Sequence, residues 1–382
     1  MTDGANNSVV KDGVTQRVHF TPEHKVLDLP DLVGHLKSSW RKLVENDLGE
    51  VFQEVSPVDD YTGEKLSLSF KSYRFGEPKF SDKEAMRDNA SYEAPLYATV
   101  ELINRTTGEV KESELYMGEY PWMTDRGTFI VNGSERVVVS QLVRSNGVYF
   151  DAEQIGEKKY YGARIMPSRG AWFQFETDAH GVIWVKIDRR RKVAATTLLR
   201  ALGYSTNTAI NELFAKVNTG DVDYIRETID KDPTRSTNEA LTEVFRRLRP
   251  GDLATIDNAR QMIERMFFDF KRFDIGKVGR YNMNRRLKDV KETLGMPTDL
   301  AETPENRVLL LDDLVAIINE IIRLNNTQEP ADDIDAFYNR RVRLVGELVA
   351  RQFRVGLLRL ERNIRDRMSV ADLATVTPAQ LI

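Results

Sequence analysis

Arginine-rich segments hold the residues of this sequence whose type and spacing could do chemistry. Residues 189–192 read RRRK, directly after the alternating segment 182–188. The segment 271–288 carries seven cations and one acid, together with Phe273 and Tyr281. A guanidinium group is planar and donates paired hydrogen bonds, which suits phosphate groups and base edges. These segments therefore predict a surface that binds a nucleic acid, with aromatic rings for stacking.

Two further basic segments are open to a second interpretation. FRRLRPGD (245–252) adds three arginines, and a helix expected over 341–368 places four more on a stripe opposite its apolar side: Arg351, Arg354, Arg362 and Arg365. On such a helix Glu347, Glu361 and Asp366 can form ion pairs, so the stripe is equally well explained as a solvated face. The formal net charge of −4 means that attraction to a polyanion must come from local patches.

Several other chemistries are excluded or disfavoured. The chain has no cysteine, so it has no disulfide, thiolate nucleophile or cysteine-ligated metal. Its histidines lack a metal-ligand spacing, and no phosphate-binding loop or hydrolase motif occurs. We interpret Asp312-Asp313 as the solvated face of a helix and Asp332-Asp333 as part of a loop. No metal site and no self-contained active site is expected.

The elements that position these residues change in character along the chain. A helix is predicted over 36–48, and strands over 97–103 and 112–120. Asn132-Gly133 predicts a type I′ hairpin within 127–142. A second hairpin is expected over 171–188, turning at 178–181, so that the RRRK run follows its outgoing strand.

Beyond residue 193 the pattern becomes helical. Helices are predicted over 207–217, 221–229, 237–248 and 257–268, and Thr303-Pro304 is predicted to cap the helix that follows. The loop 328–335 resembles a linker, and a long helix over 341–368 keeps an apolar seam. The fold class is therefore α+β: two mixed modules with antiparallel hairpins and several amphipathic helices.

The two ends of the chain support further expectations. Residues 1–19 are expected to form a disordered tail and do not match a signal peptide. No apolar run is long enough to span a membrane, so a cytoplasmic protein is expected. Residues 377–382 start a helix that stops within one turn, which suggests that the sequence is a piece of a longer chain.

A dozen ordered blocks over 20–382 resemble the N-terminal part of the bacterial RNA polymerase β subunit family. The strongest is MGEYPWMTDRGTFIVNGSERVVVSQLVRSNGVYF (117–150). Others are ARIMPSRGAWFQFE (163–176), KIDRRRK (186–192), DIGKVGRYNMNRRL (274–287) and RQFRVGLLRLERNIRDRMS (351–369). The resemblance implies a discontinuous protrusion, 20–143 plus 334–382, and a lobe, 144–333. Together these would form one wall of the DNA channel, in the nucleoid.

The resemblance also implies roles for individual residues. Val139 and Gln141 match the edge of the rifampicin pocket, and Val110-Lys111-Glu112 match a strand used by the transcription–repair coupling factor. The residues that would face promoter DNA, chiefly the non-template strand, are Arg144, Trp172, Asp188, Arg189, Arg190, Arg249 and Arg280. Two departures weaken this transfer: Asn146 replaces a proline after Arg144, and 335–341 read DAFYNRR where the family has DHLGNRR.

The family implies an assembly rather than an isolated enzyme. Its partners would be the β′, α, ω and sigma subunits with promoter and downstream DNA. The catalytic Mg would lie in β′, with no cofactor and no catalysis in these 382 residues. The alternative is a module that docks transcription factors and has little DNA affinity of its own.

Overall fold

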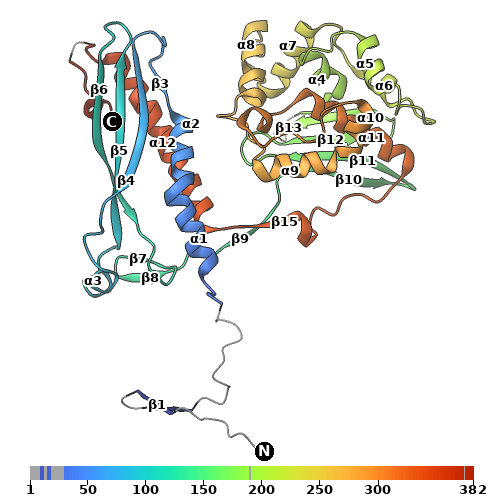
Figure 1. Ribbon diagram of the computed structural model, residues 1–382. Coiled ribbons are helices and arrows are strands. Elements are labelled where there is room, and N and C mark those ends of the chain that lie inside the picture. Colours follow the sequence, from blue (N-terminus) through green and yellow to red (C-terminus); the bar gives the residue numbers. More distant parts are fainter. Residues whose placement is uncertain (1–8, 13–14, 19–29, 189–190, 374) are drawn as a thin grey trace, which may run out of the picture. The chain divides into compact units, whose positions relative to one another are not determined.

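The computed structural model describes residues 9–12, 15–18, 30–188, 191–373 and 375–382. The chain divides into two compact units (Figure 1). Unit 1 contains the described residues up to Val139 together with Leu344–Ile382, and unit 2 is Ser140–Arg343. Each unit combines helices with antiparallel strands, which confirms the predicted α+β class.

The core of unit 1 is an antiparallel sheet packed against helices. Its strand order is β3 (Val58–Asp59), β4 (Leu66–Phe75), β5 (Glu93–Asn104) and β6 (Val110–Pro121). The packed helices are α1 (Gly34–Lys42), α2 (Leu48–Val55) and α12 (Val345–Val370), and a π-helical turn at Leu43–Asp47 joins the first two. Phe353 of α12 meets Phe52 edge to face, with ring centroids 5.3 Å apart. The apolar seam predicted for the last long helix is therefore what holds α12 to unit 1.

Short local signals fix the rest of unit 1. The hairpin of β7 (Phe129–Val131) and β8 (Ser134–Arg136) turns at Asn132-Gly133, which both have positive φ, as a type I′ turn requires. This confirms the prediction. A Cβ on Gly133 would also lie 2.8 Å from the Cα of Asn89. Two short helices complete the unit, α3 (Asp82–Arg87) and α13 (Pro378–Leu381), and each begins with a capping box.

Unit 2 is built on a five-stranded antiparallel sheet. Its order is β10 (Gly147–Ile155), β11 (Lys158–Met166), β12 (Phe173–Thr177), β13 (Ile183–Ile187) and β14 (Val193–Ala194). Strands β12 and β13 form the predicted hairpin, and buried residues alternate with half-buried ones along both. Asp178 closes the turn, because its carboxylate accepts hydrogen bonds from the backbone N–H of His180 and Val182 and from the Trp184 indole. Side-chain alternation alone was enough to predict this hairpin.

Helices cover this sheet and bury its apolar side chains in one core (Figure 1). They are α4 (Ala195–Ala201), α5 (Asn207–Phe214), α6 (Tyr224–Lys231), α7 (Thr237–Leu248), α8 (Ile256–Ile263), α9 (Lys277–Arg286), α10 (Lys288–Leu294) and α11 (Leu311–Thr327). The cap predicted at Thr303-Pro304 is wrong. Pro304–Arg307 forms a separate 3₁₀ turn, and α11 begins only at Leu311.

The chain enters and leaves unit 2 through a pair of strands. Strand β9 (Gln141–Arg144) pairs antiparallel with β15 (Arg340–Arg343), so that Gln141 lies opposite Arg343. Unit 2 therefore ends at Arg343, ten residues after the boundary expected from the linker-like loop. The boundary lies later than expected because residues 340–343 form β15, which pairs with β9 and so belongs to unit 2.

The described part of the N-terminal tail differs from the expected disorder. Strands β1 (Val9–Asp12) and β2 (Thr15–Val18) pair antiparallel. The remaining residues of the predicted tail lie outside the described residues.

Candidate nucleic-acid interface

The base of the β12–β13 hairpin presents two of the predicted site residues together. The backbone N–H of Asp188 donates to the carbonyl of Trp172 at 2.8 Å, which closes the hairpin one step beyond its last ladder pair. Asp188 has φ +50°, a left-handed conformation that aspartate tolerates better than most residues. The Trp172 side chain is exposed. The predicted residues Arg189 and Arg190 follow Asp188 and lie outside the described residues.

Arg249 reaches the same site from the end of a helix. Ser236 caps α7 through the N–H of Glu239, and the helix ends at Leu248, before Pro250-Gly251. The Arg249 side chain is 61% exposed, and its guanidinium lies 3.8 Å from the Asp252 carboxylate. That distance is too long for a hydrogen bond, so Asp252 neutralises Arg249 only weakly.

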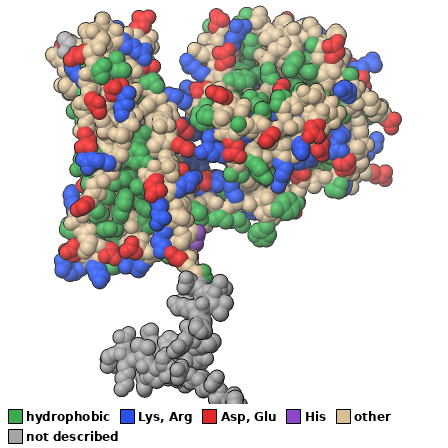
Figure 2. All heavy atoms as spheres, in the orientation of Figure 1, with side chains coloured by type: hydrophobic (Ala, Val, Ile, Leu, Met, Phe, Trp, Pro, Cys, Tyr) green, Lys and Arg blue, Asp and Glu red, His purple; other side chains and the backbone are tan. Residues whose placement is uncertain are grey.

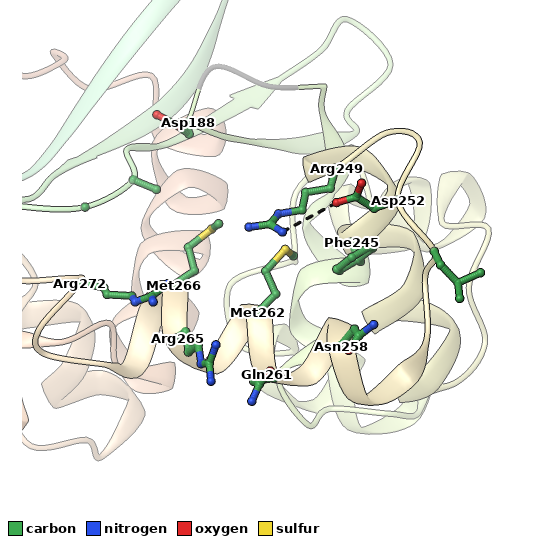
Figure 3. Close-up of a pocket in the computed structure, with 13 residues that line it drawn as sticks. Asp188, Phe245, Arg249, Asp252, Asn258, Gln261, Met262, Arg265, Met266 and Arg272 are labelled. Atoms are coloured by element: carbon green, nitrogen blue, oxygen red, sulfur yellow. Dashed lines mark ion pairs between the residues drawn. The ribbon is translucent and has the colours of Figure 1, made fainter. Parts of the chain in front are cut away.

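Helix α8 supplies the opposite side of the site. Thr255 caps it through the N–H of Asn258, and a π-helical turn, Glu264–Phe268, extends it. The turn carries Arg265 and Met266, one turn beyond Met262. In Figure 3 the Met262 and Met266 sulfur atoms and the Arg249 guanidinium point into the same space.

These elements surround a groove of about 700 Å³ within unit 2 (Figure 3), here called the lobe groove. It is lined by Gly170, Ala171, Asp188, Phe245, Arg249, Asp252, Leu253, Asn258, Gln261, Met262, Arg265, Met266 and Arg272. Three arginines face two aspartates, and two amide side chains add hydrogen-bonding groups. Phosphate groups and base edges suit the polar lining, and Met262, Met266 and Phe245 give it an apolar floor.

The arginines of the groove are weakly neutralised. Arg272 is 62% exposed and lies 3.9 Å from Asp269. Arg265 is exposed, and among the described residues no carboxylate lies within ion-pair distance of it. Elsewhere in unit 2 arginines are held much closer, as in Arg286–Glu320 at 3.0 Å and Arg247–Glu243 at 2.7 Å. The lobe groove therefore keeps cationic groups available to an external anion.

The strand pair β9–β15 holds Arg144 in a different arrangement. Arg144 donates two hydrogen bonds to the Asp335 carboxylate, Nε to Oδ1 at 3.0 Å and Nη2 to Oδ2 at 3.1 Å. Arg340 binds the same carboxylate at 2.6 Å. These bonds, from Arg144 first, hold the pKa of Asp335 below its usual range. A phosphate that binds Arg144 must replace this partner.

The Asn146 substitution does not leave the segment after Arg144 loose. Asn146 is buried, and its side-chain amide donates to the carbonyl of Ile275 at 3.3 Å. Asn282 of α9 in turn donates to the Asn146 carbonyl at 2.9 Å. These hydrogen bonds attach the segment to α9 and to the residues just before it, so the position is held although it is not a proline.

Arg280, which was predicted to face DNA, is buried instead. It is 0% exposed, and its guanidinium lies 2.7 Å from the Asp313 carboxylate, which also binds Lys291 at 2.6 Å. Asp313 is buried as well, so its interpretation as part of a solvated helix face is wrong. A guanidinium enclosed in this way cannot reach a DNA strand, and Arg280 is therefore excluded from the interface.

The rest of the basic segment 271–288 does not form one face. Arg286 binds Glu320 and Asp332, and its guanidinium lies 4.4 Å from the centre of the Phe150 ring. Phe273 is completely buried in the core, so it is not a stacking platform, whereas Tyr281 is exposed. Of the two aromatic rings of this segment, therefore, only that of Tyr281 is accessible, and stacking on it stays a prediction.

On helix α12 the arginine stripe is mixed. Arg354 lies 2.6 Å from Glu54, and Arg365 binds Glu361 at 2.8 Å and the carbonyl of Asp59. Arg351 and Arg362 are exposed. The interpretation as a partly paired, solvated face accounts for this stripe.

The remaining predicted residues are not among those that line the lobe groove. Val139 and Gln141 are exposed next to and within β9. Val110, Lys111 and Glu112 begin β6, one of the two edge strands of its sheet. Val110 is exposed, while the Lys111 ammonium donates to the carbonyl of Val376 at 3.1 Å.

Some residues of the site were missed at the sequence level. Arg265, Met262 and Met266 carry no recognisable motif, because Met262 joins the other two only once α8 and the π-helical turn after it have formed. Arg272 was visible only as one member of a basic run, and Asp335 only as an acid in a loop. Arg144, which binds Asp335, lies 191 residues away in the sequence, so no local pattern could have identified this pair.

Acidic and basic side chains are interspersed over the visible face of unit 2 in Figure 2, which agrees with the modest net charge. Within the described ranges, no group of three or more histidines and acids is arranged to hold a metal ion. No helix in the same ranges is both long and apolar enough to cross a membrane.

Comparison with known proteins identifies the family. The model described as RNA polymerase Rpb2, domain 2, matches residues 144–343, more than half of the chain and nearly all of unit 2. The chain therefore belongs to the Rpb2 family of RNA polymerase subunits.

The relatives that it matches are bacterial β subunits. It is 44% identical over 371 residues to the DNA-directed RNA polymerase subunit beta of Syntrophomonas wolfei and 44% over 392 residues to that of Chloroflexus aggregans. The value for the Dehalococcoides mccartyi protein is 47% over 364 residues. These matches cover 97%, 96% and 94% of the chain but 32%, 32% and 28% of the relatives. The predicted resemblance is confirmed, and the chain spans about a third of the length of the relatives it matches.

Proposed function

We propose that this chain, as the N-terminal part of a bacterial RNA polymerase β subunit, forms part of the wall of the DNA channel. In this proposal the lobe groove contacts the non-template strand of promoter DNA. Templated nucleotidyl transfer would be the activity of the assembly with β′, α, ω and sigma, and the catalytic Mg would belong to β′. Unit 1 would be the protrusion and unit 2 the lobe.

The observation that carries the proposal is the set of weakly neutralised arginines in the lobe groove. Arg249, Arg265 and Arg272 are all exposed, and the ion pairs of Arg249 with Asp252 and of Arg272 with Asp269 are 3.8 and 3.9 Å long. A DNA strand can therefore bind these groups without breaking strong internal ion pairs. Arg144 would contribute less to initial binding, because Asp335 already occupies it.

Salt-dependent DNA binding tests the proposal. The full 382-residue chain would be titrated with fork-junction DNA at several salt concentrations, as wild type and as Arg249→Glu/Arg265→Glu. The matched control is Arg226→Glu/Arg235→Glu, which makes the same charge change at two exposed arginines of unit 2 outside the groove.

The groove variant is expected to weaken binding by at least tenfold at low salt. Its salt dependence should fall by about 1.4 in slope, since each phosphate contact to a single strand contributes about 0.7. For the control variant, the change in the logarithm of Kd relative to wild type should be less than half of the change for the groove variant. Equal losses in both variants, or an unchanged slope in the groove variant, would overturn the assignment of the groove.

A factor-docking module is the second candidate, because β6 ends its sheet with Val110 exposed. An outer strand can accept a further strand from a partner such as the transcription–repair coupling factor. If the wild-type chain does not bind fork-junction DNA even at low salt, this docking role becomes the better explanation.

A further inference from the structure

Two segments that are far apart in the sequence both line the lobe groove, and a backbone bridge joins them. Gly170 and Ala171 lie in the loop between β11 and β12, and Arg272 lies in the loop after the π-helical turn. The N–H of Arg169 donates to the carbonyl of Asp274 at 2.9 Å, and the N–H of Asp274 donates to the carbonyl of Arg169 at 2.9 Å. A displacement of Asp274 would therefore move lining residues of both segments.

The two segments approach each other closely at Gly170. This residue has φ +110°, and a Cβ there would lie 2.7 Å from the Phe273 ring and 3.1 Å from the carbonyl oxygen of Arg272. Phe273 is completely buried, whereas the neighbouring Arg272 side chain is 62% exposed. The backbone of Arg272 is therefore held between the core and the facing loop, and only its side chain extends into solvent.

The Asp274 carboxylate holds the bridge in place. Asp274 is 5% exposed, and it accepts two hydrogen bonds from the Arg307 guanidinium, Nε to Oδ1 at 2.9 Å and Nη2 to Oδ2 at 2.5 Å. Its Oδ1 also accepts from the N–H of Gly276 at 2.7 Å. The N–H of Ile275 donates to the carbonyl of Arg307 at 2.8 Å. Side-chain and main-chain bonds therefore both attach this stretch to the 3₁₀ turn Pro304–Arg307.

The other two arginines of this cluster are bound within the protein. The guanidinium groups of Arg307 and Arg169 lie 5.0 and 5.4 Å from the centre of the Phe270 ring, and Arg169 also donates to the carbonyl of Phe270 at 2.6 Å. Arg307 is 12% exposed and Arg169 is 22% exposed. An ion pair this deeply buried is costly to break from one side, so the carboxylate of Asp274 is firmly placed.

We propose that Asp274 is a positioning residue of the lobe groove, which acts on DNA through Arg272. This inference rests on the proposed function and deepens it, because it names the group that orients one of the phosphate-binding arginines. The carboxylate does not itself reach DNA, since it is buried and occupied by Arg307. It fixes the backbone from which Arg272 extends, so that the guanidinium can bind a phosphate without first ordering the loop.

A double-mutant cycle with DNA binding as its readout tests this role. The full chain would be titrated with fork-junction DNA at several salt concentrations, as wild type, Asp274→Asn, Arg272→Ala and the double variant. Asparagine keeps the shape of aspartate but removes the charge that pairs with Arg307. The matched control is Asp232→Asn, which breaks another buried ion pair of unit 2, that with Arg200, at a residue that does not line the groove.

Asp274→Asn is expected to weaken binding about threefold and to lower the salt slope by about 0.7, the contribution of one phosphate contact to a single strand. In the Arg272→Ala background it should change neither quantity, because the arginine that it positions is gone. A carboxylate that only stabilises the fold would not show this dependence on Arg272, and Asp232→Asn should bind as wild type. If Asp274→Asn does not fold, Arg307→Lys replaces it in the cycle with the same expectations, since lysine keeps the charge but cannot donate the paired hydrogen bonds.

Three results would overturn the positioning role: wild-type affinity of Asp274→Asn, an undiminished loss in the Arg272→Ala background, or an equal loss for Asp232→Asn. In each of these cases wild type still binds DNA with its salt slope, so the proposed function of the lobe groove is unaffected. Absence of any binding by wild type at low salt would instead overturn the proposed function and the positioning role with it.

Discussion

The lobe groove and the buried cluster of Arg280, Lys291 and Asp313 use the same residue types in opposite ways. Arg272 and Arg280 lie in one basic segment of the sequence, yet the first is 62% exposed and the second is 0% exposed. The difference comes from α11, which places Asp313 against α9 and α10. A run of cations therefore does not reveal which side chains face outward, because the position of the opposing carboxylate decides this.

The energetic consequences also differ. Two cations share one carboxylate in the buried cluster, and none of the three is exposed. A charge left there without a partner cannot be hydrated, so each member depends strongly on the others. In the lobe groove water solvates each guanidinium, and the loss of one ion pair costs little.

The largest effect on stability is expected from removal of the Asp313 carboxylate, the centre of the buried cluster. Asp313→Ala leaves two buried cations unpaired, and we expect it to lower the free energy of unfolding by about 3–5 kcal/mol. Urea unfolding followed by circular dichroism measures this change. The control is the neighbouring Asp312→Ala, which should stay within about 0.5 kcal/mol of wild type. Similar effects of the two substitutions would refute the distinction.

An intermediate effect on stability is expected at a second buried carboxylate, that of Asp232, where hydrogen bonds from the protein replace those from water. Burial alone would raise the pKa of Asp232, but hydrogen bonds from Thr234, Thr197 and Thr196 outweigh it and lower the pKa below 3.8. Arg200 also binds this carboxylate, at 3.0 Å. Because the folded pKa is lowered, the unfolded chain takes up the proton first as the pH falls. The stabilisation is therefore complete above about pH 4, the unfolded pKa, and is lost below it.

Asp232→Asn should remove this pH dependence. At neutral pH we expect it to cost about 1.5–3 kcal/mol, since it breaks charged hydrogen bonds in the interior. Between pH 5 and 3 the stability of wild type should fall more steeply than that of the variant. Urea unfolding at several pH values tests both statements, with the exposed Asp230→Asn as control. Parallel curves for wild type and Asp232→Asn would contradict the lowered pKa.

The smallest effect is expected for the exposed pair Arg144–Asp335, in which two arginines share one carboxylate, as two cations do in the buried cluster. A double-mutant cycle with Arg144→Ala and Asp335→Ala should give a small favourable coupling at low salt. The coupling should vanish at 1 M salt, where the screening length is about 3 Å. A coupling that persists at 1 M salt would show that this pair behaves like a buried one.

The sequence predicted local features better than distant ones. The turn at Asn132-Gly133 and the β12–β13 hairpin depend on neighbouring residues, and both were predicted. Asp313 could not be placed, because α11 is buried on nearly all sides and its apolar period does not single out a solvent face. Asp188 was identified only through family resemblance, and Arg249 was identified both as one arginine of a basic segment and through the resemblance. Arg265 was not identified, since it joins them only once α8 and its π-helical turn are in place.

The pairing of β9 with β15 has a consequence for how such a chain can change. Gln141 and Arg343 lie directly opposite each other, so the backbone enters and exits unit 2 about one strand spacing apart, roughly 5 Å. A short loop could bridge that gap in place of the whole of unit 2. A change that replaces, enlarges or deletes unit 2 would then leave unit 1 able to form its sheet and helices. Unit 2 can therefore diversify independently of unit 1.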